Sequence, residues 1–141
     1  RLKTIIQNER SNMPIRFYNP QNVSTRPIPY SHGAEVKAGS DLIFMSGQVG
    51  RTLPDGDLLP DFEGQIRQTY INIKAVLDDA GMNLTNIVKM TTYITDRNNL
   101  AAMREIRKEI LGDHKPAHTL VIVAGLAFEE YLIEVDCTAA V

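Results

Sequence analysis

Two segments with helical spacing, each lying between β-rich segments, constrain the fold of this chain most strongly. In residues 61–81 the apolar side chains recur at three- and four-residue steps on one face, through Phe62, Ile66, Ile73, Val76, Leu77 and Ala80. Asp61 is a candidate N-cap, and Gly81 suits the left-handed residue just beyond the helix end. Residues 99–111 repeat the spacing through Leu100, Met103, Ile106 and Ile110. The pattern predicts two helices.

The remaining apolar segments are typical of strands. Residues 87–95 alternate apolar and polar side chains and are rich in β-branched types. Proline offers no N–H to a sheet, so the proline-containing stretch 18–33 is predicted to be irregular. Residues 51–60 read as a loop that turns at Asp55-Gly56. The other predicted strands are a buried one within 41–50, one within 118–126 and one at 131–141.

This order of elements predicts an α+β fold. Two strand–helix–strand crossovers place parallel strands in a mixed sheet, and two helices are enough to cover only one of its faces. The other face is expected to be apolar too, because the strands are rich in Leu, Val and Ile. An apolar face of that size is normally buried, so we expect the chain to form a homo-oligomer.

Composition excludes several classes of protein. The 141 residues fit one domain, and a net charge of −2 with a pI near 5.9 gives no basic surface for nucleic acid or an anionic membrane. The single cysteine, Cys137, excludes an internal disulfide and favours a reducing, cytoplasmic location. Residues 1–12 precede Met13 and are interpreted as an N-terminal extension or an added remnant, with residues 13–141 forming the domain.

Six short motifs lie along roughly residues 16–141, namely "PYSHG", "DLIFMSGQVG", "NIKAVLDDAG", "VKMTTYI", "PAHT" and "LIEVDCTA". Taken in this order, they resemble the Rid family, whose members are also called YjgF or L-PSP proteins and reactive intermediate deaminases. The resemblance implies a chorismate-mutase-like fold, in which a six-stranded mixed sheet carries two helices on one face. It also implies a homotrimer with a central β-barrel and three clefts between subunits. The implied activity is hydrolysis of enamines and imines to keto acids and ammonia, without a metal or organic cofactor.

The resemblance also implies site residues. Tyr30 corresponds to the family's cleft tyrosine, Ser46 to the serine of the Ser-Gly-Gln stretch, and Glu134 to the cleft glutamate of the last strand; these three are the candidate catalytic residues. Gly47, beside Ser46, is assigned to substrate binding. Where RidA-like deaminases carry a carboxylate-binding arginine, this chain has His118. We expect weaker carboxylate binding, because histidine has fewer donors and is charged only part of the time near neutral pH.

A second departure concerns the cation that an anionic ligand requires. The asparagine of the family's second helix falls at Arg104 in this sequence. Arg51 directly follows "SGQVG" and is expected near Ser46. The hypothesis is that Arg104 or Arg51 supplies the positive charge that is missing at position 118.

Each of these residues also has a simpler interpretation. Glu134 could be a solvated strand residue or one half of a salt bridge at a subunit interface. His118 could be a strand-edge residue bonded to backbone, and Tyr30 and Ser46 could have only local structural roles. Cys137 is predicted to be a buried, inert thiol. A metal site is not expected, since Pro116 prevents a helix between two of the three histidines.

Three functions remain open from the sequence. The first is a cofactor-independent deaminase that hydrolyses a small enamine or imine to a carbonyl product and ammonia in a cleft between subunits. The second is a non-catalytic trimer that binds a small metabolite or a partner protein. The third, an endoribonuclease that inhibits translation, is disfavoured by the acidic pI and the absence of a basic stripe.

Overall fold

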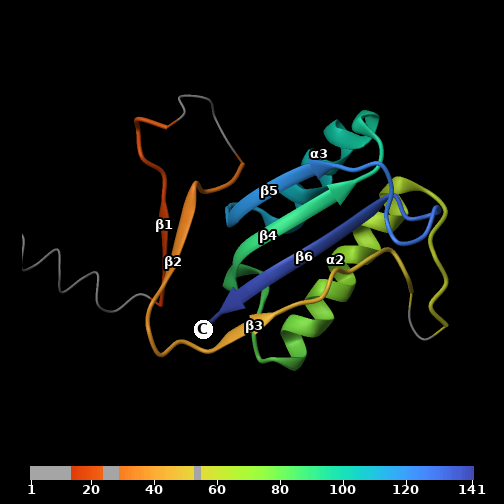
Figure 1. Cartoon of the computed structure of the whole chain (residues 1–141). Coiled ribbons are helices and arrows are strands. Elements are labelled where there is room, and N and C mark those ends of the chain that lie inside the picture. The colour runs from red at the N-terminus through yellow and green to blue at the C-terminus, as the bar shows by residue number, and fades with distance from the viewer. Residues whose placement is uncertain (1–13, 24–28, 53–54) are drawn as a thin grey trace, which may run out of the picture.

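A computed structural model describes residues 14–23, 29–52 and 55–141, and in these ranges the chain forms six strands and two α-helices (Figure 1). The assignment of residues 1–12 lies outside the described residues. The elements are β1 (Ile15–Tyr18), β2 (Gly33–Val36), β3 (Leu42–Phe44), α2 (Phe62–Asp79), the 3-10 turn η1 (Leu84–Asn86), β4 (Ile87–Ile94), the 3-10 turn η2 (Arg97–Asn99), α3 (Leu100–Leu111), β5 (Ala117–Ile122) and β6 (Ile133–Ala140).

Four of the strands form a mixed sheet in the order β3-β6-β4-β5. Strand β4 pairs in parallel with β5 after the crossover through α3, whereas β6 is antiparallel to both β4 and β3. The strands before and after α2, β3 and β4, are predicted to pair in parallel, but they are not neighbours, because β6 lies between them. The two strands still run in the same direction, as the crossover requires.

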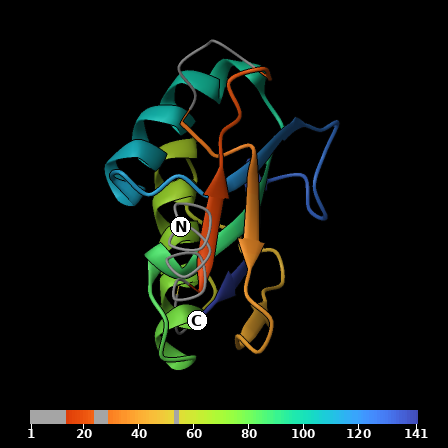
Figure 2. The ribbon, with the colours of Figure 1, turned by 90° about the vertical axis from the view of Figure 1, so that its left-hand side faces the viewer.

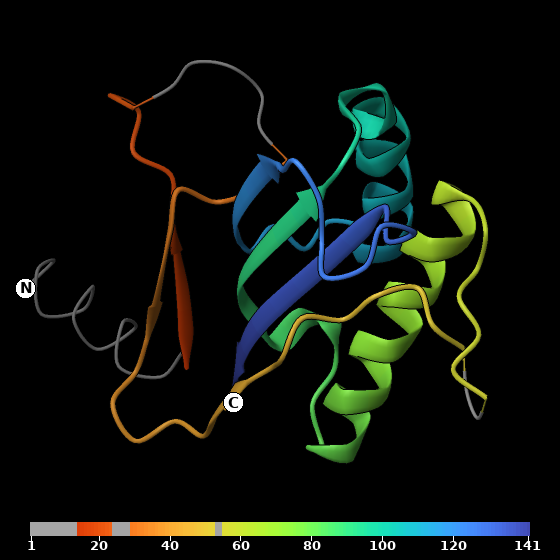
Figure 3. The ribbon, with the colours of Figure 1, turned by 45° about the vertical axis from the view of Figure 1, so that its right-hand side comes forward.

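Strands β1 and β2 form a separate antiparallel ribbon, which stands beside the sheet in Figures 1 and 3. A single bridge between Ser31 and Ala117 links the segment before β2 to β5, through a hydrogen bond of 3.1 Å from the Ser31 N–H to the Pro116 carbonyl. The next residue turns away, because the His32 N–H bonds the Tyr18 carbonyl at 3.0 Å. The implied six strands are therefore present, but divided between two sheets.

Both helices pack on one face of the four-stranded sheet, as Figure 2 shows from the side of the ribbon. Their apolar stripes meet the inward-pointing residues of β4 and β6 in one core. The residues at its centre are at most 1% exposed and include Ile66, Ile73, Leu77, Met90, Ile94, Met103, Ile133 and Val135. Cys137 lies in the same core, and burial raises the pKa of its thiol to about 12, which fits the predicted inert cysteine.

The predicted limits of helix α2 are confirmed. The Asp61 carboxylate accepts a hydrogen bond of 2.7 Å from the Gly64 N–H, which satisfies one of the free donors of the first turn. Gly81 has a φ of +68°, in the region that favours glycine. Neither helix, in the ranges that the structure describes, is long and apolar enough to cross a membrane.

The uncovered face of the sheet differs from the expectation. Its central side chains are mostly polar: Lys89, Thr91, Tyr93, Thr119, Glu134, Asp136 and Thr138. Most of the Leu, Val and Ile residues of these strands lie on the helix side instead, because the strands alternate apolar and polar residues, and Val121, the partner of Tyr93, is an exception. Strand β3 is an edge strand and not the buried strand predicted. Its residues Leu42 and Phe44 are 45% and 77% exposed.

We predict that Asp61→Ala lowers the free energy of unfolding by about 1 kcal/mol, because the first turn of α2 loses its cap. Urea unfolding followed by circular dichroism measures the change. Asp55→Ala is the matched control, since it removes the same charge from an exposed turn, and it should shift stability by less than about 0.5 kcal/mol. Equal effects of the two substitutions would contradict the capping role.

Candidate functional site

The start of strand β5 places His118 under helix α3. Pro116 is buried just before the strand, and the alternation of β5 then turns His118 toward the side of the sheet that the helices cover. Helix α3 presents Met103, Ile106 and Arg107 to the same side, because these positions share one helical face. His118 therefore lies between the central strand β4 and helix α3.

Two hydrogen bonds fix the His118 ring. Its Nδ1 lies 2.5 Å from Nη1 of Arg107, and its Nε2 lies 2.8 Å from Oγ1 of Thr92. A guanidinium has donors only, so Nδ1 of His118 must accept. The ring proton is consequently on Nε2, which donates to the Thr92 hydroxyl. The partners are side chains, not the backbone groups of the simpler interpretation.

His118 is neutral in this environment. Burial, and then the positive charges of Arg107 and Lys89, lower the pKa of its imidazole to about 3. The expectation that His118 is charged part of the time near neutral pH is therefore wrong for this chain. The sequence could not show this, because the cause is the position of Arg107.

Arg107 is the functional candidate that the sequence analysis missed. It is only 4% exposed, and its Nη2 also donates to the Pro29 carbonyl at 3.3 Å. Burial lowers its pKa from the ordinary 12.5, but an arginine stays protonated at neutral pH. The sequence spacing could have indicated Arg107 as a candidate. Arg107 lies four residues after Met103 and three before Ile110, which places it in the apolar stripe of the helix.

A hollow of about 360 Å³ opens beside His118. It brings together three of the predicted residues, Tyr30, Arg104 and His118, with Arg107 at its wall. A second hollow of about 520 Å³ continues around the edge strand and is lined by Tyr30, His118 and Lys89, among others. Arg104 is exposed, whereas Arg107 is buried, so the two cations differ in access to a ligand.

Glu134, Ser46 and Gly47 form a second group, on the uncovered face. A Cβ atom added at Gly47 would lie 1.9 Å from Oε1 of Glu134, so only glycine leaves room for this carboxylate. Ser46 precedes it and is exposed, and the neighbouring Gln48 pairs with Val135 of β6. On the same face the Tyr93 hydroxyl donates to Asp136 at 3.4 Å, and the negative charge of Asp136 raises the pKa of Tyr93.

The two groups do not meet within one chain. Glu134 alternates with the core residues Ile133 and Val135 and so points away from the helices, whereas His118 points toward them. In register, Glu134 pairs with Tyr93, while His118 pairs with Met90, three positions along β4. The predicted site residues are thus split between the two faces of the sheet.

Arg51 belongs to neither group. Its Nε donates to the Tyr131 hydroxyl at 2.8 Å and its Nη1 to the Gly56 carbonyl at 2.6 Å. Its guanidinium also lies over the rings of Phe128 and Tyr131. These contacts are at the start of β6, the opposite end of the sheet from the start of β5.

No group of three potential metal ligands occurs within the described ranges. The polar groups at the start of β5 instead suit a small organic ligand with a negative charge. Arginine binds carboxylates strongly, and tyrosine can add a hydroxyl contact. The carboxylate of Glu134 on the other face suits proton transfer.

Comparisons with known proteins identify the class to which this fold belongs. Residues 23–141 match the family described as Endoribonuclease L-PSP. A RutC family protein of Pyrococcus horikoshii is 38% identical over 116 residues, which cover 81% of this chain and 89% of that protein. The Rid protein YyfB of Yersinia pestis superposes with a TM-score of 0.80 at 31% identity, covering 92% of this chain and 100% of that one.

The chain therefore belongs to the Rid family, and the predicted α+β fold with a mixed sheet and two helices is confirmed. TdcF of Escherichia coli, whose name assigns it provisionally to the reactive intermediate deaminases, is 31% identical over 114 residues. These cover 79% of this chain and 85% of TdcF. A structure of TdcF with bound serine superposes with a TM-score of 0.66 at 31% identity, covering 88% of this chain and 97% of TdcF.

We predict that His118 stays neutral, with its proton on Nε2, when the pH falls from 8 to about 5, because its folded pKa is about 3. Imidazole ¹⁵N chemical shifts report both the charge and the tautomer. A charged His118 ring at pH 6 would contradict the assignment.

The same shift makes stability depend on pH. The unfolded chain binds a proton near pH 6.5, whereas the folded chain does so only near 3, so the folded state loses stability as the pH falls through this interval. As the pH falls, the free energy of unfolding should decrease more steeply in the native chain than in the His118→Gln variant. The difference between the two slopes should correspond to about one bound proton. Urea titrations between pH 7 and 4 measure both slopes, and equal slopes would contradict the prediction.

Proposed function

We propose that this protein hydrolyses a small imine or enamine to a carbonyl compound and ammonia, in a cleft completed by a second copy of the chain. The observation that carries the proposal is the carboxylate of Glu134, which is seated against Gly47 and has no salt-bridge partner among the described residues. The proposal is also supported by the relative TdcF, whose name assigns it provisionally to the reactive intermediate deaminases.

The chemistry requires one group that moves protons. An enamine first gains a proton on carbon and becomes an iminium ion. A water molecule then attacks the electrophilic carbon while a carboxylate such as that of Glu134 takes its proton. The same carboxyl group returns the proton to nitrogen. The carbon–nitrogen bond then breaks while the new hydroxyl group loses its proton to solvent, which leaves the carbonyl product and free ammonia and balances the proton taken up by the enamine carbon. No step requires a metal or an organic cofactor.

A negatively charged substrate would be held at the His118 hollow. Arg104 is the exposed cation there, which keeps the hypothesis that it replaces the missing charge, and the Tyr30 ring lines the same hollow. Arg107 adds a positive potential from below. Serine bound to TdcF supports a ligand of amino-acid size. For Arg51, the contacts with Tyr131, Gly56 and Phe128 favour a structural role instead.

A homotrimer is part of the proposal, because the Glu134 group and the His118 group lie on opposite faces of one sheet and can meet only across a subunit boundary. The exposed Leu42 and Phe44 of β3 supply apolar area for such a boundary. The polar side chains of the uncovered face, Glu134 and Lys89 among them, would then line it. Sedimentation analysis tests the assembly, and a stable monomer that deaminates imines would overturn this part.

A non-catalytic trimer that binds a metabolite is the second candidate. It is favoured by the state of His118, whose ring nitrogens both have partners inside the protein. An endoribonuclease, despite the family description, is disfavoured by the net charge of −2. A cytoplasmic location stays a prediction.

We predict that the native chain accelerates ammonia release from 2-aminoacrylate or a longer enamine generated in situ, and that Glu134→Gln reduces the rate by roughly 10²–10⁴-fold, because the proton-transfer group is lost. A coupled ammonia assay measures both rates. Thermal shifts with small carboxylates in the absence of any acceleration would instead support the binding protein.

Gly47→Ala should reduce the same rate at least tenfold, because the new Cβ displaces the Glu134 carboxylate. Gly125→Ala is the matched control, since nothing lies within 4 Å of a Cβ at that position. The control should keep the native rate. A fully active Gly47→Ala variant would show that the seat of Glu134 is not required.

A further inference from the structure

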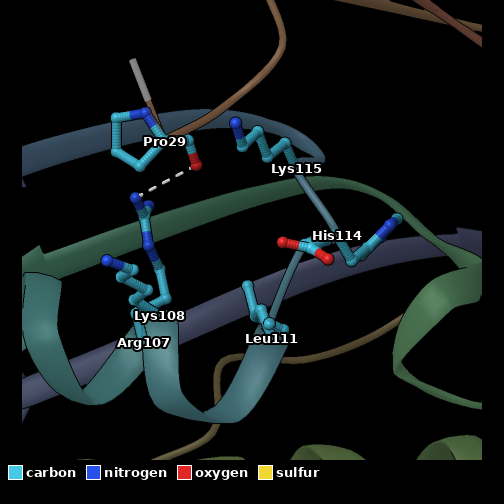
Figure 4. A pocket seen from close by; sticks show the side chains of 8 residues that line it. Pro29, Arg107, Lys108, Leu111, His114 and Lys115 are labelled. Carbon is cyan, nitrogen blue, oxygen red and sulfur yellow. Dashed lines mark hydrogen bonds between the residues drawn. The ribbon is translucent and has the colours of Figure 1, made fainter. Parts of the chain in front are cut away.

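A third hollow, of about 330 Å³, lies at the carboxyl end of α3 (Figure 4) and shares Pro29 and Arg107 with the hollow beside His118. Arg107 and Lys108 reach it from the helix, and Lys115 reaches it from the segment before β5. Pro29, the first residue of "PYSHG", lines this hollow, but none of the proposed catalytic steps uses it.

The buried charge of Arg107 has no counter-ion in the described part of the chain. Its partners are the neutral His118 ring and the Pro29 carbonyl. The carboxylates in ion pairs there, Glu63, Glu109 and Asp78, all bind other cations. A buried charge is normally paired, so an arginine that is 4% exposed and lines a hollow indicates a missing anion.

The charges around the hollow favour an anion of more than one negative charge. Three cationic side chains face one carboxylate, that of Asp113, which leaves an excess of two positive charges. The neighbouring His114 bonds the Ile87 carbonyl through Nε2 at 2.8 Å. Two carbonyls of the last turn of α3 are also occupied, because the Lys108 carbonyl accepts from the Gly112 N–H and the Leu111 carbonyl accepts from the His114 N–H.

We propose that this hollow binds inorganic phosphate or a small phosphate monoester. The Arg107 guanidinium would contact the phosphate oxygens from below, and Lys108 and Lys115 would neutralise the rest of its charge. A phosphate group carries about −1.5 to −2 at neutral pH, which matches the excess positive charge better than a carboxylate does. The proposal does not depend on the deaminase activity.

Isothermal titration calorimetry with inorganic phosphate, glycerol 3-phosphate and neutral glycerol tests the proposal. Both phosphates should bind and glycerol should not, and tighter binding of the ester would identify an organic phosphate as the ligand. The double variant Lys108→Gln/Lys115→Gln should weaken binding at least tenfold and should keep the native rate of ammonia release.

The double variant Lys74→Gln/Arg97→Gln removes the same charge from exposed positions elsewhere and should bind phosphate like the native chain. Backbone amide shifts on adding phosphate should centre on residues 107–115. Equal weakening in both double variants, shifts centred on residues 118–120, or no binding at millimolar phosphate would each overturn the proposal.

Discussion

The hydrogen-bonded chain from Arg107 through His118 to Thr92 connects the features on which the site depends. It joins helix α3 to the edge strand β5 and the central strand β4 in three consecutive side chains. Because arginine only donates, the chain has one direction and sets one tautomer of the histidine. It also places a positive charge, almost fully buried, at the wall of two hollows, the one beside His118 and the one at the carboxyl end of α3.

This arrangement changes what position 118 can do. A histidine that accepts from an arginine cannot gain a proton without losing that bond, so it acts as a neutral support and not as a cation. The positive charge in this region is carried by the helix instead. If Arg104 and Arg107 bind an anion in the hollow beside His118, a helix and not the strand residue at position 118 supplies the positive charge.

The sheet divides the remaining polar groups between its two faces. The helix-covered face is apolar except where Thr92 and His118 interrupt it, and the uncovered face carries Glu134, Asp136 and Lys89. A surface of this composition is not buried for its hydrophobicity alone. Association through it would be directed by polar contacts, with the exposed Phe44 and Leu42 of β3 contributing the apolar part.

The sequence by itself determined the two helices, the cap at Asp61 and the turn at Gly81, because these follow from local spacing and local backbone preference. It also indicated the family, through the resemblance of several motifs in order. It also placed Tyr30, Arg104 and His118 in a common region. The alternation of residues 131–141 also predicted that Glu134 lies opposite the apolar side chains of its strand. Only the tertiary structure decided that Arg107 faces His118, that the His118 ring is neutral and that His118 lies on the face opposite Glu134. Those properties depend on burial and on charges brought together from distant segments, and no local pattern in the chain records them.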